Sequence, residues 1–429
     1  MLNMFMKIKV VFKNNYLLFI GLVLLNFLIT IFFFIDIQQN SKELGICDTY
    51  VEYTYTNLGN NINFKYPTNP CDDKYYFNAV GDFNALFNEE ANVYQNRPLF
   101  ILGISGIQKI SNFGSVTFNG NEIPVLEFLI FQLITVTFSQ ILIVRLVENF
   151  RKLKKIDVLV VSLLIMIFPL FRFEIFKTSN QTFSLLIFVI PLYLAVKKKN
   201  ITYVDYLLVG TLFLFNRSFA ITLIFCALYT FPKTLKNFND LLMYISKLLS
   251  FFIPSIFYRF YMLFYNLEKV DINAELYGQF IWLNNYFVRY GNALSLRLFD
   301  KPFFEYRNFN SDWHCVSIPE NFICYFNDTI ITSRYLIGGV VIVLLLSFSS
   351  KVPKLVVKNL LLITSISYLF WSLIGWYPPI RFNLYSIGMC LTLLAVLQII
   401  FLNSNFKKIM FMIIWSAYFY QIEHWNVFS

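Results

Sequence analysis

The sequence predicts an all-α polytopic membrane protein, and three observations support this. Of the 429 residues, 57% are hydrophobic and only 14% are charged, whereas soluble domains carry about 25% charged residues. Apolar runs recur along the chain at lengths that approach the roughly 20 residues of a membrane-crossing helix. Lys and Arg residues fall mostly in short segments between these runs, which is typical of cytoplasmic loops.

We expect about eleven transmembrane helices, which form a single domain over residues 1–429. The first run follows Lys7, Lys9 and Lys13 but lacks a small-x-small cleavage site, so we expect an uncleaved helix and not a signal peptide. The expected spans are Tyr16–Ile35, Pro124–Val147, Ile156–Phe171, Phe183–Val196, Tyr203–Phe215, Phe219–Phe231, Leu242–Tyr265, Ile330–Ser347, Leu355–Trp376, Asn383–Leu402 and Ile409–Tyr420.

The charged residues predict the orientation. With the N-terminus in the cytoplasm, every short basic cluster lies on the cytoplasmic side, as the positive-inside rule requires. The net charge of +10 is therefore assigned to these loops and not to nucleic-acid binding. The clusters are Arg151, Lys152, Lys154 and Lys155; Lys197, Lys198 and Lys199; Lys233 and Lys236; Lys351, Lys354 and Lys358; Lys407 and Lys408.

The segment Tyr203–Phe231 allows two interpretations. It could be one long helix with Arg217 at mid-depth, but that would reverse the side of every later loop and break the charge pattern. We therefore expect two short spans that meet at residues 216–218 near the outer face.

Two large outer loops follow from this topology, over residues 36–123 and 266–329. Cys47 and Cys71 lie in the first loop, and Cys315 and Cys324 lie in the second. Two pairs, each confined to one loop, fit disulfides in an oxidising compartment, with Cys47–Cys71 and Cys315–Cys324 as the most local pairing. Four free thiols remain the alternative.

Two amphipathic helices are expected on the outer surface, within the first loop. Tyr75–Phe87 has apolar residues at helical spacing. Pro98–Ile110 is a second apolar stretch, and it opens with a proline in a favourable helix-start position. Both are expected to lie on the outer surface or dip into it.

Asp72 and Asp73 follow Cys71 and open the first of these surface helices. Carboxylates at a helix N-terminus complement its free N–H groups and its dipole, so the pair could simply cap the helix. Alternatively, one carboxylate faces a cavity and takes a proton from an acceptor hydroxyl as a general base.

These features resemble the GT-C superfamily of integral-membrane glycosyltransferases. In that family one inward-to-outward helix precedes a large outer loop with two surface helices, an acidic motif of the type Asp-Glu/Asp-x-x-Tyr and a Pro-Leu segment. The matching positions here are Asp72, Asp73, Tyr76, Ala79, Arg97, Pro98 and Leu99.

The resemblance implies transfer of a sugar from a polyprenyl-phosphate carrier to a lipid, glycan or protein acceptor at the extracytoplasmic face of the cytoplasmic membrane. It implies a base role for Asp72 or Asp73, with Asp72 slightly favoured and Asp82 as a third candidate.

Arginines predicted at the outer face are candidates for binding the donor phosphate, because the guanidinium pairs bidentately with phosphate oxygens. These are Arg97, Arg217 and Arg381, each of which could instead anchor the chain at the interface or pair with a loop carboxylate. Tyr76 and Glu174 are further candidate site residues.

No cofactor is expected, and an obligatory metal is not expected either. The only two histidines, His314 and His424, lack a second Cys/His pair at ligand spacing. Asp72 and Asp73 could hold Mg²⁺ or Mn²⁺, since oxygen ligands suit these ions.

Three other functions remain open. Arg289, Arg297 and Arg307 in the second outer loop keep a polysaccharide polymerase or ligase in view. A transporter is less favoured, because no mid-span carboxylate or internal repeat is evident. A non-enzymatic membrane subunit is the third.

Overall fold

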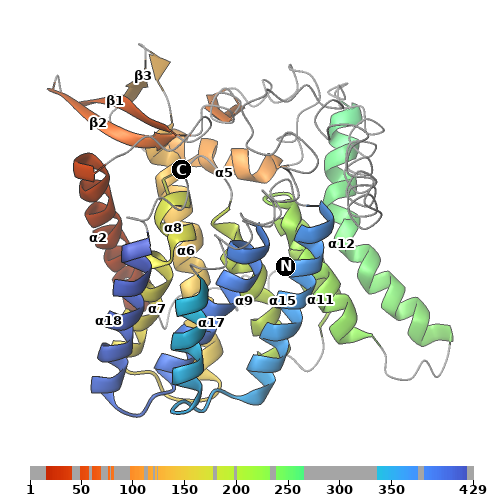
Figure 1. The fold of residues 1–429 in the computed structure, drawn as a ribbon. Helices are drawn as coiled ribbons and strands as arrows, with labels where there is room; N and C mark the ends of the chain where they lie inside the picture. The colour runs from red at the N-terminus through yellow and green to blue at the C-terminus, as the bar shows by residue number, and fades with distance from the viewer. Residues whose placement is uncertain are drawn as a thin grey trace, which may run out of the picture.

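Helices dominate the computed structural model, as the sequence predicted, and most of them pack side by side in a bundle (Figure 1). The structure describes residues 16–40, 49–57, 60–68, 76–77, 79–81, 97–110, 115–118, 121–122, 124–176, 181–197, 201–231, 238–264, 336–374 and 381–422. The helical elements are α2 (Tyr16–Asn40), α5 (Pro98–Ile110), α6 (Val125–Glu148), α7 (Lys155–Ile167), α8 (Pro169–Glu174), α9 (Phe183–Lys197), α10 (Tyr203–Phe213), η2 (Arg217–Phe219), α11 (Ala220–Thr230), α12 (Phe238–Phe264), α15 (Lys354–Ile374), η3 (Arg381–Gly388), α17 (Met389–Ile400) and α18 (Asn405–Ile422), with a further helix over Leu336–Ser347.

Three helices in the described part of the chain are long and apolar enough to cross a membrane: Ile20–Gln38, Val125–Glu148 and Phe238–Met262. Six further apolar helices have 10–17 residues. These helices identify a membrane protein. The count of eleven spans and the orientation in the membrane stay predictions.

Most predicted spans differ from the observed helices by a few residues at their ends, and two of the differences affect the position of charged residues. Helix α2 continues past Ile35 to Asn40, so Asp36 is helical and does not begin a loop. The predicted span Ile156–Phe171 is divided into α7 and α8 at Phe168, whose backbone is extended at φ −60° and ψ 129°. The cause is Pro169, because a proline disfavours helical backbone at the residue before it.

A four-stranded antiparallel sheet lies within the predicted outer loop 36–123, where the sequence analysis expected only helices. Its strands are β1 (Thr49–Asn57), β2 (Asn60–Thr68), β3 (Ser115–Phe118) and β4 (Asn121–Glu122), in the order β2-β1-β3-β4. The Thr, Tyr and Val residues of β1 favour a strand, and this signal was overlooked. Helix α5, at the predicted bounds, lies across the same end of the bundle as the sheet (Figure 1).

The segment Tyr203–Phe231 forms two helices, as expected, and not one. Helices α10 and α11 are joined by a short turn in which the side-chain oxygen of Asn216 accepts a hydrogen bond from the Ser218 N–H at 2.9 Å. Arg217 therefore lies at the end of a helical hairpin.

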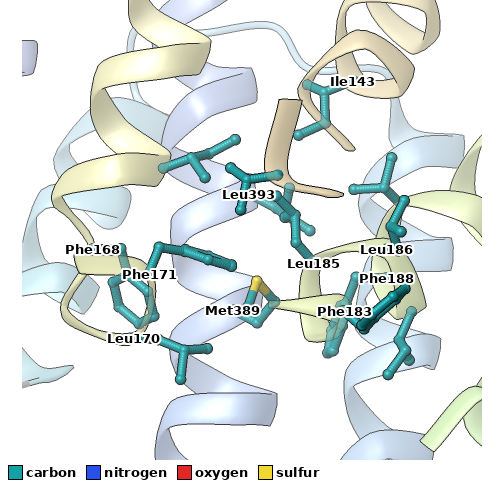
Figure 2. Packing of buried hydrophobic residues seen from close by; sticks show 14 of the residues in the cluster. Ile143, Phe168, Leu170, Phe171, Phe183, Leu185, Leu186, Phe188, Met389 and Leu393 are labelled. Carbon is teal, nitrogen blue, oxygen red and sulfur yellow. The ribbon is translucent and has the colours of Figure 1, made fainter. Parts of the chain in front are cut away.

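The apolar core forms where α17 inserts between neighbouring helices. Met389 and Leu393 of α17 lie between Phe171 on one side and Leu185 and Phe188 on the other (Figure 2). All five side chains are at most 1% exposed and belong to one continuous apolar cluster. This packing fixes α7, α8 and α9 around α17.

A buried polar network ties α2 to α6 and α7. The Asn26 amide nitrogen donates to Thr137 Oγ1 and Gln140 Oε1, each at 2.8 Å. The Asn26 amide oxygen accepts from Gln140 Nε2 at 3.2 Å and from Ser162 Oγ at 2.6 Å. The Asn26 amide thus uses both donors and both acceptor positions.

A buried ion cluster joins the α6–α7 turn to the α17–α18 turn, at the end of the bundle opposite α5. The Asp157 carboxylate pairs with Lys408, and both side chains are fully buried. It also accepts from Arg151 Nη2 and from the Lys154 N–H, each at 2.9 Å. Arg151 donates as well to the Ile400 carbonyl at 2.6 Å. Two of the basic clusters predicted to share a side are therefore joined through the carboxylate of Asp157.

Replacing Asn26 with Leu is expected to lower the free energy of unfolding by about 2 kcal/mol, because hydrogen bonds between membrane helices contribute roughly 0.6–2 kcal/mol each. Thermal unfolding of the detergent-purified protein measures this. The control is Ser365→Ala, which removes an exposed bond inside one helix. Equal melting temperatures for the two variants would contradict the role given to Asn26.

Replacing Asp157 with Asn is expected to cost about 3–5 kcal/mol, because Lys408 would remain buried without a counter-charge. The same thermal assay applies. Glu148→Gln removes an exposed carboxylate that pairs with Arg145 in the neighbouring turn, and little change is expected there. A melting temperature unchanged by Asp157→Asn would mean that the cluster contributes nothing to stability.

Candidate functional site

Tyr76 and Arg97 form the centre of the candidate site. Arg97 Nη1 donates a hydrogen bond to the Tyr76 hydroxyl at 2.6 Å. Arg97 directly precedes α5, and its carbonyl accepts the N–H groups of Phe100 and Ile101. The hydrogen bond therefore joins Tyr76, the tyrosine that ends the acidic motif, to the residue that precedes α5, and both residues belong to segments matched by the resemblance.

Aromatic side chains hold Tyr76 in place. Its ring is 1% exposed and meets the rings of Phe100 and Phe128 edge to face, at centroid distances of 5.6 and 5.9 Å. Phe77 meets Phe128 at 6.1 Å. Because edge-to-face contacts are favourable and directional, they fix the position of the Tyr76 hydroxyl.

The same aromatic cluster extends to the hairpin turn that carries Arg217. Phe131 of α6 lies 5.6 Å from Phe100 and stacks on Phe215 at 6.2 Å. Phe215 precedes Arg217 by two residues. The structure thus brings Tyr76, Arg97 and the Arg217 turn to one end of the bundle.

The Arg97 side chain has a donor suited to an anion. Its Nε is buried and has no hydrogen-bond partner among the described residues. A guanidinium donates through several N–H groups in a fixed plane. Nη1 donates to Tyr76, so the Nε–H group remains as a donor for another acceptor.

Arg172 and Asp36 form an ion pair that the sequence analysis missed. Arg172 Nη2 lies 2.5 Å from Asp36 Oδ2, and the guanidinium lies over the Phe33 ring at 4.8 Å. The sequence signal for this ion pair was Asp36, which directly follows the first apolar run. The predicted topology placed Asp36 at the start of the outer loop. The pair ties α8 to α2.

The remaining predicted site residues are only partly described. Glu174 ends α8, and Arg381 begins η3. Several predicted residues lie outside the described residues, so the base and the disulfides stay predictions. These are Asp72, Asp73, Asp82, Cys47, Cys71, Cys315, Cys324, His314 and His424.

Metal ligands do not gather in the described part of the chain, where no group of three or more His, Cys, Asp or Glu residues could hold an ion. Asp72 and Asp73, the candidate ligands for Mg²⁺ or Mn²⁺, lie outside that part. Cys226 and Cys390 are buried as free thiols.

Comparison with known proteins gave no relative, since no family model, curated protein or solved structure matches the chain.

Replacing Tyr76 with Phe is expected to lower the free energy of unfolding by about 1–2 kcal/mol, because a hydrogen bond to a charged donor is lost while the ring stays packed. Tyr229→Phe is the control, because it removes a bond to the neutral Ala195 carbonyl. Thermal unfolding compares them. A larger loss for Tyr229→Phe would contradict the importance given to the Tyr76–Arg97 bond.

Proposed function

We propose that this protein is a GT-C-type glycosyltransferase, which moves a sugar from a polyprenyl-phosphate donor to a lipid, glycan or protein acceptor. The observation that carries the proposal is the hydrogen bond between Arg97 and Tyr76. It supports a site at the end of the helical bundle in which the Arg97 cation meets the tyrosine of the acidic motif.

The covalent backbone limits how far Asp72 and Asp73 can lie from Tyr76. Asp73 and Asp72 precede Tyr76 by three and four residues. At most about 3.6 Å is spanned per residue, so their Cα atoms are within roughly 11 and 14 Å of that of Tyr76. We assign the general base to one of these carboxylates, and Asp72 is favoured by its position in the motif.

The reaction that fits these groups is a direct displacement at the anomeric carbon. The acceptor oxygen forms the new bond to that carbon while the bond to the phosphate oxygen breaks. The aspartate takes the acceptor proton, which makes the oxygen nucleophilic as it attacks. The leaving polyprenyl phosphate carries the electron pair of the broken bond, and inversion at the anomeric carbon follows.

Arginines stabilise the departing phosphate in this proposal. Arg97 directs N–H donors from the start of α5, and Arg217 approaches from the hairpin turn on the same aromatic cluster. Such fixed donors stabilise charge as it develops on the leaving group. Arg381 and Glu174 are assigned supporting roles. The protein would be a multi-pass component of the cytoplasmic membrane, with this end facing the periplasm or exterior.

Asp72→Asn and Asp73→Asn test the base. Wild-type membranes are expected to transfer radiolabelled sugar from cell-derived polyprenyl-phosphate donors to a membrane acceptor. The variant that lacks the base is expected to lose about 100-fold or more in rate, since general-base catalysis contributes 10²–10⁴-fold.

The control is Asp240→Asn, in the first turn of α12 and far along the chain from the motif. Its transfer rate is expected to match the wild type. Full transfer by both Asp72→Asn and Asp73→Asn would refute the base assignment. Absence of transfer by the wild type across a broad donor set would refute the enzyme class.

A further inference from the structure

Helix α5 packs against the Phe131 ring of α6 at a glycine. A Cβ atom built on Gly103 of α5 would lie 2.6 Å from Phe131 Cε2 and 3.1 Å from Phe131 Cζ. Carbon atoms in van der Waals contact are about 3.5–4.0 Å apart, so a larger residue at position 103 would displace the ring. The absence of a side chain on Gly103 therefore lets α5 and the Phe131 ring lie this close together.

The Phe131 ring also contacts three other aromatic rings. Its centroid lies 5.6 Å from that of Phe100, 6.1 Å from that of Phe183 and 6.2 Å from that of Phe215. The Phe131 and Phe215 rings are stacked, with an angle of 18° between their planes. Phe183 contacts Phe215 as well, at 5.5 Å. A displacement of the Phe131 ring would therefore change the packing of Phe215.

Phe215 leads into the turn that carries Arg217. Within this turn the Asn216 side-chain oxygen accepts from the Ser218 N–H at 2.9 Å, and the Asn216 carbonyl accepts from the Phe219 N–H at 3.1 Å. These bonds are local and fix the shape of the turn. The stack of Phe215 on Phe131 links the turn to α5.

We propose that Phe131 is a positioning residue, which sets the place of the Arg217 turn relative to Arg97 at the start of α5. Gly103 admits the Phe131 ring against α5, and the ring supports Phe215. The effect on the turn does not depend on the proposed reaction. The effect on catalysis rests on the proposed function, in which Arg97 and Arg217 act on one phosphate. Their separation then matters, because a misplacement of about 1 Å can cost roughly 100-fold in rate.

Gly103→Ala and Gly106→Ala form a matched pair of variants on α5. Both replace a glycine inside the helix with a better helix former. A Cβ on Gly103 meets Phe131, whereas a Cβ on Gly106 has no heavy atom of the described residues within 4 Å. Hydrogen–deuterium exchange at the Ser218 amide is measured on the full-length protein in nanodiscs. Gly103→Ala is expected to accelerate it roughly five-fold, as for loss of one aromatic contact, and Gly106→Ala is expected to match the wild type.

Phe131→Leu is a second variant, which removes the ring and leaves α5 unchanged. The same acceleration at the Ser218 amide is expected. Exchange equal to the wild type in Phe131→Leu would overturn the positioning role, as would equal acceleration by Gly103→Ala and Gly106→Ala. These measurements require no sugar transfer, so they decide the role of Phe131 even if the proposed function fails.

Initial-rate kinetics test the consequence for catalysis. In Gly103→Ala and Phe131→Leu the KM for the polyprenyl-phosphate donor is expected to rise about five-fold, with the KM for the acceptor unchanged, because donor binding is weakened. A folding defect alone would lower the amount of active enzyme and leave the donor KM unchanged. A donor KM equal to that of the wild type, in variants whose Ser218 amide exchanges faster, would overturn the link to catalysis. Transfer by the wild type tests the proposed function separately.

Discussion

The Asn26 amide is the constraint on which the arrangement of the helices depends. In a membrane no water is available to a buried polar group, so each donor and acceptor needs a partner within the protein. Asn26 meets this requirement only when α2 lies against both α6 and α7, because its partners come from those two helices. Apolar packing alone would let α2 slide or rotate. The network therefore fixes its register, and with it the position of Asp36 opposite Arg172.

The two ends of the bundle use different chemistry. At one end Asp157 neutralises cations from two turns and holds them together below the protein surface. At the other end a single hydrogen bond from Arg97 is framed by aromatic rings. In the ion cluster the Asp157 carboxylate is already paired with cations, whereas the buried Arg97 Nε has no acceptor among the described residues and is a donor for an anion. This contrast is why the proposed transfer reaction is assigned to the end that carries α5.

The proposed reaction makes one demand on the protein at the membrane surface. A sugar carried on a polyprenyl phosphate approaches from the membrane, so the enzyme must keep cations near the level of the headgroups. Arg97 and Arg217 would do so at the site, because the aromatic cluster of Phe100, Phe131 and Phe215 joins the start of α5 to the turn that carries Arg217.

Composition and hydropathy determined the helical membrane class and the bounds of α5, because each follows from local patterns over a few turns. The hairpin at Arg217 followed from the basic clusters of the later loops, which share one side only if Tyr203–Phe231 forms two spans. The sheet was not predicted, although Thr49–Asn57 carries strand-forming residues, because a strand is stable only with its partners β2 and β3, and β3 lies more than fifty residues further along the chain. Tertiary structure alone decided that Asn26 meets Gln140, that Asp157 meets Lys408 and that Arg97 meets Tyr76. Such pairs join residues far apart in the chain, and their geometry arises only when helices pack at a particular rotation and depth.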